Sequence, residues 1–277
     1  MNSIIKFKGR YLFVSFLVIS VFFFGCKDQK ETNDTEKKEY NHEEIVKRKS
    51  KEQRYASHIA EIHKAEHYKS EAYVSFELAI ELPELKDHVK IVKATDFSEF
   101  KFTSEEFGEF YIIGEELFKT ESSKFTSELA KNYLEFAFIF GAFSELYQIE
   151  NSFSEIEELE AFDNNFKVLR IESINSGLKH IPSPVTSLTD SRTDMIKALS
   201  MELNLTGEEN LLYFDRYITV NRIPVSLTWK LFKNNEKTNF NNTIGEIKVS
   251  RIKYYSEGEF QLKIPEEVAK FEDISSI

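Results

Sequence analysis

The sequence predicts an α+β protein whose fold is dominated by a large, mostly antiparallel sheet. Two observations favour the sheet. Apolar residues alternate with polar ones along residues 71–82, and further alternating segments separated by turn residues fill the last third of the chain. A third observation adds a helix, because aromatic side chains recur at helical spacing between residues 124 and 148.

The chain begins with the features of a secretory signal peptide. A short basic stretch precedes the apolar run Tyr11–Phe24, and Gly25 and Cys26 follow. As a helix, this run would span only about 21 Å, which is less than the ~30 Å hydrocarbon core of a bilayer. The layout resembles the signal of bacterial lipoproteins, in which a small residue precedes the cysteine that becomes acylated. The resemblance implies removal of residues 1–25 and lipid attachment at Cys26, the single cysteine of the chain.

A polar tether and a charged helix are expected next. Residues 26–44 carry almost no apolar side chains, which is typical of a flexible linker. Asn41 is a candidate N-cap for a helix that continues to just before Ser70. We expect a single α+β domain over residues 45–270 and a C-terminal tail at 271–277.

Strands are expected from residue 71 to residue 119. The segment 71–82 places its apolar side chains on one face, where Val74, Phe76, Leu78 and Ile80 follow one another, and Pro83 ends it. Shorter strands are expected at 89–94, 97–102, 107–113 and 115–119.

The segment 124–148 predicts a helix with an aromatic stripe. The stripe consists of Phe125, Leu129, Tyr133, Phe136, Phe140, Phe143 and Tyr147, which are three or four residues apart. Such a stripe is ordinarily part of a core, and it could also cover a ligand site.

The remaining elements are, in order, a strand at 166–174, a helix near 190–205, and strands at 211–220, 223–233, 244–255 and 259–264. Along 223–233, one face carries Val225, Leu227, Trp229 and Leu231.

The last third also contains three short motifs: Tyr213-Phe214-Asp215, Asn221-Arg222-Ile223-Pro224-Val225, and a final segment from Phe260 to Pro265. With these motifs the chain resembles a group of Bacteroidetes lipoproteins that are similar in layout to the LolA-type lipoprotein-carrier fold. The resemblance implies a curved, incomplete barrel whose concave face is covered by helices and is able to hold an acyl chain. The residues expected to line that ligand are Val74, Phe76, Leu78, Ile80, Phe136, Phe140, Leu227 and Trp229.

The composition excludes several classes of function. Thirty-six Lys and Arg against 47 Asp and Glu give a formal charge of −11, whereas a nucleic-acid-binding surface needs basic residues. One cysteine permits neither an intramolecular disulfide nor a zinc site built on cysteines. No glycine-rich phosphate loop is present in the sequence, and we expect no cofactor.

Residues 63–67 have the pattern H-x-x-E-H, which is the inverted zinc-peptidase motif. On a continuous helix, His63 and His67 would share one face, and Glu66 could polarise a metal-bound water. Glu135 and Glu145 are candidates for a third ligand. This segment is rich in Lys and Glu, so a chance match with two solvated or half-buried histidines is the alternative.

Three functions are therefore open. The leading one is a non-catalytic envelope lipoprotein that is anchored in the membrane through acylated Cys26 and binds a lipid or another apolar ligand. It would be located at the outer membrane of a Gram-negative bacterium, facing the periplasm or the cell surface. The second is a zinc-dependent hydrolase that uses His63 and His67. The third is a surface interaction module without a ligand cavity.

Replacing Cys26 by Ser should abolish lipid attachment, because the hydroxyl cannot take the place of the acylated thiol. We expect the Cys26→Ser variant to move from the membrane to the soluble fraction and to lose labelling by a clickable fatty acid. Persistent labelling of this variant would contradict the lipoprotein hypothesis.

Overall fold

The computed structural model describes six stretches of the chain, at residues 49–114, 116–154, 156–161, 164–175, 183–233 and 243–273. They belong to one compact unit, Lys47–Ile277. The predicted signal peptide, Cys26 and the tether lie outside the described residues. Among the described helices, none is long and apolar enough to cross a bilayer.

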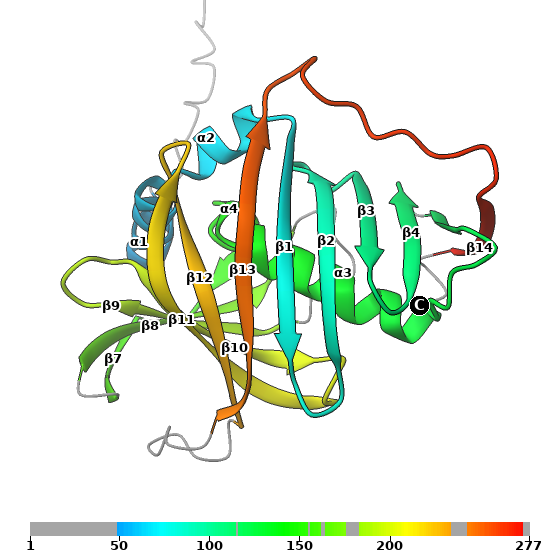
Figure 1. Ribbon diagram of the computed structural model, residues 1–277. Coiled ribbons are helices and arrows are strands. Elements are labelled where there is room, and N and C mark those ends of the chain that lie inside the picture. Colours follow the sequence, from blue (N-terminus) through cyan, green and yellow to red (C-terminus); the bar gives the residue numbers. More distant parts are fainter. Residues whose placement is uncertain are drawn as a thin grey trace, which may run out of the picture. The chain divides into compact units, whose positions relative to one another are not determined.

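The described strands form one antiparallel sheet that does not close on itself (Figure 1). In chain order they are β1 (Tyr73–Glu81), β2 (Lys86–Ala94), β3 (Glu99–Ser104), β4 (Gly108–Ile113), β5 (Glu116–Lys119), β6 (Ser152–Phe153), β7 (Glu157–Ala161), β8 (Asn164–Ser173), β9 (Val185–Asp190), β10 (Ile196–Leu203), β11 (Glu208–Val220), β12 (Ile223–Lys233), β13 (Thr243–Tyr255) and β14 (Ala269–Asp273). Their order across the sheet is β14-β5-β4-β3-β2-β1-β13-β12-β11-β10-β9-β8-β6, and β7 also pairs with β8. The prediction of a large, mostly antiparallel and open sheet is therefore confirmed.

The predicted helix near residues 190–205 is wrong, because this stretch forms the hairpin β9–β10. Oδ1 of Asp190 accepts hydrogen bonds from the backbone N–H groups of Arg192 and Thr193, which stabilises the turn of the hairpin. The apolar residues of β10 also fit a helical period. Pairing with β9 on one side and β11 on the other decides the outcome in favour of a strand.

The predicted strand at 259–264 is also wrong. Residues 256–268 contain no strand, and Leu262 instead packs with Val92 and Tyr111 in a cluster separate from the main core. The last strand is β14, which pairs with β5 and crosses the predicted domain boundary at residue 270.

The described helices are α1 (Lys51–Ile62), α2 (Ala65–Ser70), α3 (Ser127–Gly141) and α4 (Phe143–Leu146). α1 begins at the N-cap Ser50, which forms a capping box with Gln53. The helix expected to continue unbroken to residue 70 is divided at Lys64, whose φ of 58° lies in the left-handed region.

The aromatic stripe of α3 packs against the sheet and supplies a large part of the main core. Figure 1 shows α3 lying along one face of β1–β4. The Phe140 ring stacks on Phe76 of β1 with centroids 3.8 Å apart. Tyr133 packs edge-on against Phe102 of β3 and Phe110 of β4. A helix with a buried aromatic stripe is thus present as predicted, although it ends at Gly141 and α4 follows as a separate turn.

Replacing Phe136 by Ala should lower the free energy of unfolding by about 3–5 kcal/mol, because Phe136 is almost completely buried in the main core and a large-to-small change leaves a void. Chemical denaturation measures this difference. Lys131→Ala, on the same helix and outside the buried stripe, is the matched control and should change stability by less than about 1 kcal/mol. An equally small loss for Phe136→Ala would contradict the packing of α3 as core.

Candidate functional site

An apolar cleft of about 40 Å³ lies between helices α3 and α4 and strands β10–β12. Its apolar lining consists of Ile139, Phe140, Ala142, Phe143, Ile196, Leu199, Phe214, Pro224, Val225 and Trp229. The polar residues at the cleft are His63, Tyr217 and Ser226, and no charged side chain lines it. Such a surface suits an aliphatic or aromatic ligand.

Two of the residues predicted to line a ligand, Phe140 and Trp229, border this cleft. Five others belong to the same core cluster but lie outside the cleft: Val74, Phe76, Leu78, Ile80 and Phe136. Leu227 is partly buried and belongs neither to the cleft nor to a core cluster. Strands β1 and β12 therefore contribute side chains to the same core, and the apolar cleft lies at the β12 part of that core.

His63 lies at the end of α1 and is buried at the edge of the cleft, with 1% of its surface exposed. Its Nε2 accepts a hydrogen bond from the backbone N–H of Ile196 at 3.0 Å, and its ring stacks on Phe143. Burial lowers the pKa of His63 to about 3. The imidazole is therefore neutral at physiological pH and adds no charge to the cleft.

Tyr217 completes the support of Ile196. Its hydroxyl donates a hydrogen bond to the Ile196 carbonyl at 2.6 Å. The pairing of β9 with β10 shifts in register between Ile196 and Ala198. Here the side chains of His63 and Tyr217 supply hydrogen bonds to the backbone of Ile196. Arg216, which precedes Tyr217 in β11, has a φ of 55° in the left-handed region.

The H-x-x-E-H segment does not form the expected metal-binding face. The break at Lys64 places His63 at the end of α1 and His67 in α2. Nε2 of His67 donates a hydrogen bond to the Asn221 carbonyl at 2.9 Å, so this nitrogen is occupied. Among the described residues, no cluster of three His, Cys, Asp or Glu side chains could hold a metal ion.

The two candidate third ligands are engaged elsewhere. Glu135 is buried and accepts a hydrogen bond from the backbone N–H of Asn204 at 3.1 Å. Burial raises the pKa of Glu135 to about 8. Glu145 forms an ion pair with Lys69 at 3.1 Å. The geometry that the zinc hypothesis requires is thus not assembled by these residues.

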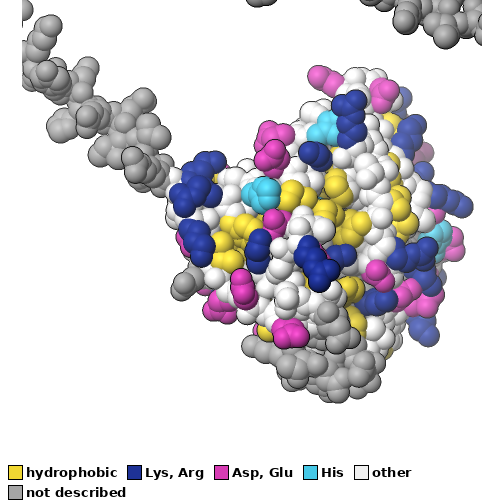
Figure 2. Space-filling view, turned by 90° about the vertical axis from the view of Figure 1, so that its left-hand side faces the viewer, with side chains coloured by type: hydrophobic (Ala, Val, Ile, Leu, Met, Phe, Trp, Pro, Cys, Tyr) yellow, Lys and Arg dark blue, Asp and Glu magenta, His cyan; other side chains and the backbone are white. Residues whose placement is uncertain are grey.

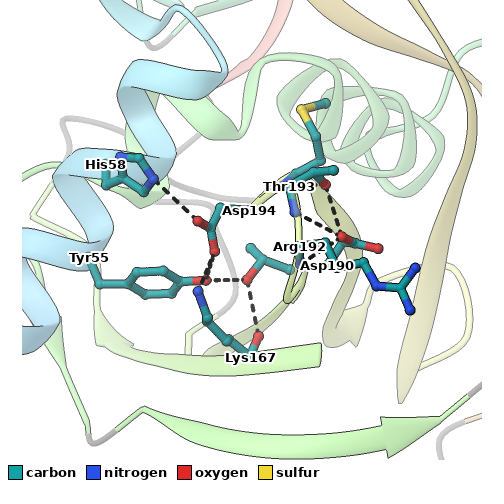
Figure 3. A network of polar contacts seen from close by, with 9 residues as sticks. Tyr55, His58, Lys167, Asp190, Arg192, Thr193 and Asp194 are labelled. Atoms are coloured by element: carbon teal, nitrogen blue, oxygen red, sulfur yellow. Dashed lines mark hydrogen bonds and ion pairs between the residues drawn. The ribbon is translucent and has the colours of Figure 1, made fainter. Parts of the chain in front are cut away.

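A polar network attaches α1 to the sheet beside the cleft (Figure 3). Asp194, in the turn after β9, accepts hydrogen bonds from Lys167 Nζ at 2.7 Å and from the Tyr55 hydroxyl at 3.0 Å. Nε2 of His58 lies 3.2 Å from Oδ2 of Asp194. The Tyr55 hydroxyl also contacts the Thr189 hydroxyl at 2.5 Å. Burial acts to raise the pKa of Asp194, but the bonds from Lys167 and Tyr55 outweigh it and lower that pKa.

A second, wider hollow of about 430 Å³ lies along α1, α2 and residues 147–149. Its lining includes charged side chains of both signs, among them Glu61, Lys64 and Glu66. Figure 2 shows a band of hydrophobic side chains bordered by charged ones on the face at the left of Figure 1. We take the apolar cleft as the candidate site, because its lining carries no charge.

No protein-family model matches the chain, and no curated protein matches it significantly in sequence. Several solved structures are similar to it in fold. A LolA superfamily protein from Nitrosomonas europaea has a TM-score of 0.44 at 9% identity, over 72% of this chain and 92% of its own. A DUF1329 family protein from Desulfovibrio piger has a TM-score of 0.41 at 9% identity, over 74% and 95%. A putative outer membrane lipoprotein-sorting protein domain from Vibrio parahaemolyticus has the same four values.

Stability should fall in acid because of His63. Its folded pKa of about 3 lies below the ordinary value of 6.5, so the unfolded chain binds the proton more tightly. The stabilisation is therefore complete above pH 6.5 and is lost as the pH falls toward 3. The loss from this one group approaches about 1.4 kcal/mol per pH unit.

The test compares urea unfolding across this pH range for the wild type and for His63→Gln, whose amide oxygen can still accept from Ile196. The variant should lose less stability in acid than the wild type. His67→Gln, which changes a partly buried histidine outside the cleft, is the control and should follow the wild type. Identical acid profiles for all three proteins would contradict the buried neutral His63.

Proposed function

We propose that this protein is a non-catalytic lipoprotein of the cell envelope, held at a membrane by lipid on Cys26, that binds a lipid or another apolar ligand. The ligand would occupy the cleft between α3, α4 and β10–β12. The single observation that carries the proposal is the uncharged, largely apolar lining of that cleft.

The polar groups at the cleft support an apolar ligand because the protein itself satisfies them. His63 Nε2 and the Tyr217 hydroxyl are bonded to the backbone of Ile196. The Ser226 hydroxyl donates to the Asp215 carbonyl at 2.7 Å. A ligand in the cleft would therefore gain by removing apolar surface from water, at about 25 cal/mol per Å², and would need no polar group there.

The size of the cleft implies that binding widens it. An engineered apolar cavity of roughly 150 Å³ admits one benzene molecule, whereas this cleft measures about 40 Å³. A long chain would enter as Phe143 of α4 separates from β10–β12, while the hydrogen bond from Ile196 to His63 is kept.

A surface interaction module without a ligand cavity is the second candidate. The dense packing of aromatic rings between α3 and β1–β4 favours it, since this part of the interior is already filled. In that case the cleft would stay closed in the presence of every apolar probe.

The ligand hypothesis predicts contact quenching of Trp229, the single tryptophan of the chain. Trp229 borders the cleft, so a long-chain alcohol brominated at mid-chain should quench its emission saturably when bound. The full chain in phosphatidylcholine nanodiscs is titrated with this alcohol. The unbrominated alcohol should restore the emission by competition.

A nonspecific effect of the bilayer is controlled by a phosphatidylcholine that is brominated at the same chain position. It should quench Trp229 weakly and without competition. Saturable quenching by the alcohol supports the ligand hypothesis. Failure of the alcohol to quench Trp229 at any concentration would leave the interaction module as the better account.

A further inference from the structure

Three hydrogen-bonding groups are buried in the main core without a hydrogen-bond partner among the described residues: Lys93 Nζ, the Tyr68 hydroxyl and the Tyr254 hydroxyl. Lys93 and Tyr68 are completely buried, and Tyr254 is 8% exposed. Burying such a group without a partner costs roughly 1–3 kcal/mol in proteins. Three of them near one place in the core therefore require an explanation.

The fold brings these groups together from three elements. Val74 of β1 is paired with Lys93 of β2 on one side and with Tyr254 of β13 on the other. Tyr68 of α2 packs edge-on against Tyr254, with ring centroids 6.1 Å apart. A Cβ atom added at Gly141 would lie 2.5 Å from the Tyr68 hydroxyl and 2.8 Å from Lys93 Nζ. The amine and this hydroxyl thus converge on one point beside Gly141.

The cluster adjoins the apolar cleft. Gly141 ends α3 beside the amine, while the next two residues, Ala142 and Phe143, line the cleft. The Phe143 ring packs edge-on against Tyr68, with centroids 5.2 Å apart. Phe143 therefore separates the convergent polar groups from the apolar space.

Phe97 holds the amine from the other side. Lys93 Nζ lies 3.5 Å from the centroid of the Phe97 ring, and Phe97 has a φ of 63°. This conformation is uncommon for a bulky residue and stores strain, which is frequent at ligand sites. A cation over an aromatic face is also stabilised when it is charged.

Donors exceed acceptors at this point. A protonated lysine offers three N–H donors and no acceptor, and each phenol adds an O–H donor. Burial lowers the pKa of Lys93 well below its ordinary value, while the charges of Glu145 and Asp96 oppose this shift. Neither carboxylate is hydrogen-bonded to the amine in the described structure. An anionic, acceptor-only group would satisfy the amine and the Tyr68 hydroxyl together.

We propose that the ligand is a long-chain fatty acid whose carboxylate binds Lys93 and the Tyr68 hydroxyl while its chain lies in the cleft. This inference rests on the proposed function and adds the identity of the head group. One lysine matches one negative charge. Even a Cβ atom at Gly141 would lie within 3 Å of both the Tyr68 hydroxyl and Lys93 Nζ, so these two side chains must move apart to admit the carboxylate. Rotation of the Phe143 ring connects the two parts of the site.

Binding should then be coupled to proton uptake. Burial disfavours the charged form of free Lys93, whereas a carboxylate pairs best with the ammonium form. The neighbouring phenols do not compete for this role, because burial raises the pKa of both Tyr68 and Tyr254. Affinity for the acid should consequently weaken as the pH rises.

The test compares a fatty acid brominated at mid-chain with the matching alcohol, by quenching of Trp229 in the full chain in nanodiscs. A charge-assisted hydrogen bond in a buried site should make the acid bind at least about tenfold more tightly. Lys93→Met should bring the acid-to-alcohol ratio close to one. Lys90→Met, on the same strand and exposed, is the matched control and should keep the wild-type ratio.

Two further measurements keep the test independent of how Lys93→Met folds. Tyr68→Phe removes only the hydroxyl and should lower the ratio several-fold. Titration calorimetry in buffers of different ionisation enthalpy should detect proton uptake with the acid and none with the alcohol.

The remaining outcomes contradict either the head-group assignment or the proposed function. Equal binding of acid and alcohol, or a ratio that Lys93→Met and Tyr68→Phe leave unchanged, would overturn the head-group assignment and leave the proposed function intact. Stronger quenching by an acidic phospholipid with the same brominated chain would also overturn that assignment. Absence of quenching by every brominated chain would overturn the proposed function itself.

Discussion

The packing of α3 against the sheet is the interaction on which the other features depend. A wide open sheet presents an inward face that its own side chains do not fill, so another element must cover it. The stacked pair Phe76–Phe140 joins the middle of that face to the helix. Where α3 ends at Gly141 and α4 begins, packing becomes less complete, and the apolar cleft lies at this change. The donor cluster of Lys93 adjoins the same junction.

Much of the sheet could be predicted from local periodicity, because β1 and β12 and part of β13 alternate between apolar and polar residues. The hairpin β9–β10 could not. Ile196, Leu199 and Leu203 are spaced as on a helix, and only distant partners such as Tyr213 of β11, opposite Ala198, decide for a strand. The strand expected at 259–264 was wrong for a related reason. Leu262 packs on the side chains of Val92 and Tyr111 of the sheet, and its segment does not pair with the sheet as a strand.

The site was less predictable than the fold. Phe140 and Trp229 were expected near a ligand and border the cleft, but the β1 residues named with them lie outside it. His63 was considered as a metal ligand, and the break at Lys64 that gives it a different role has no clear signal in the sequence. Lys93 was missed altogether. Its one local signal is that it shares the alternating face of Val89 and Ile91, so a strand with that face inward would bury the amine.

The central claim is that the interior beside α3 and α4 takes up an apolar ligand, and native mass spectrometry of the protein extracted from its own membrane tests it most directly. The account predicts a non-covalent adduct that collisional activation removes, with the mass of a long-chain fatty acid, while covalent acyl groups on Cys26 remain. Lys93→Met should show the adduct much less often than Lys90→Met. Repeated isolation of the wild-type protein without any such adduct would contradict the account.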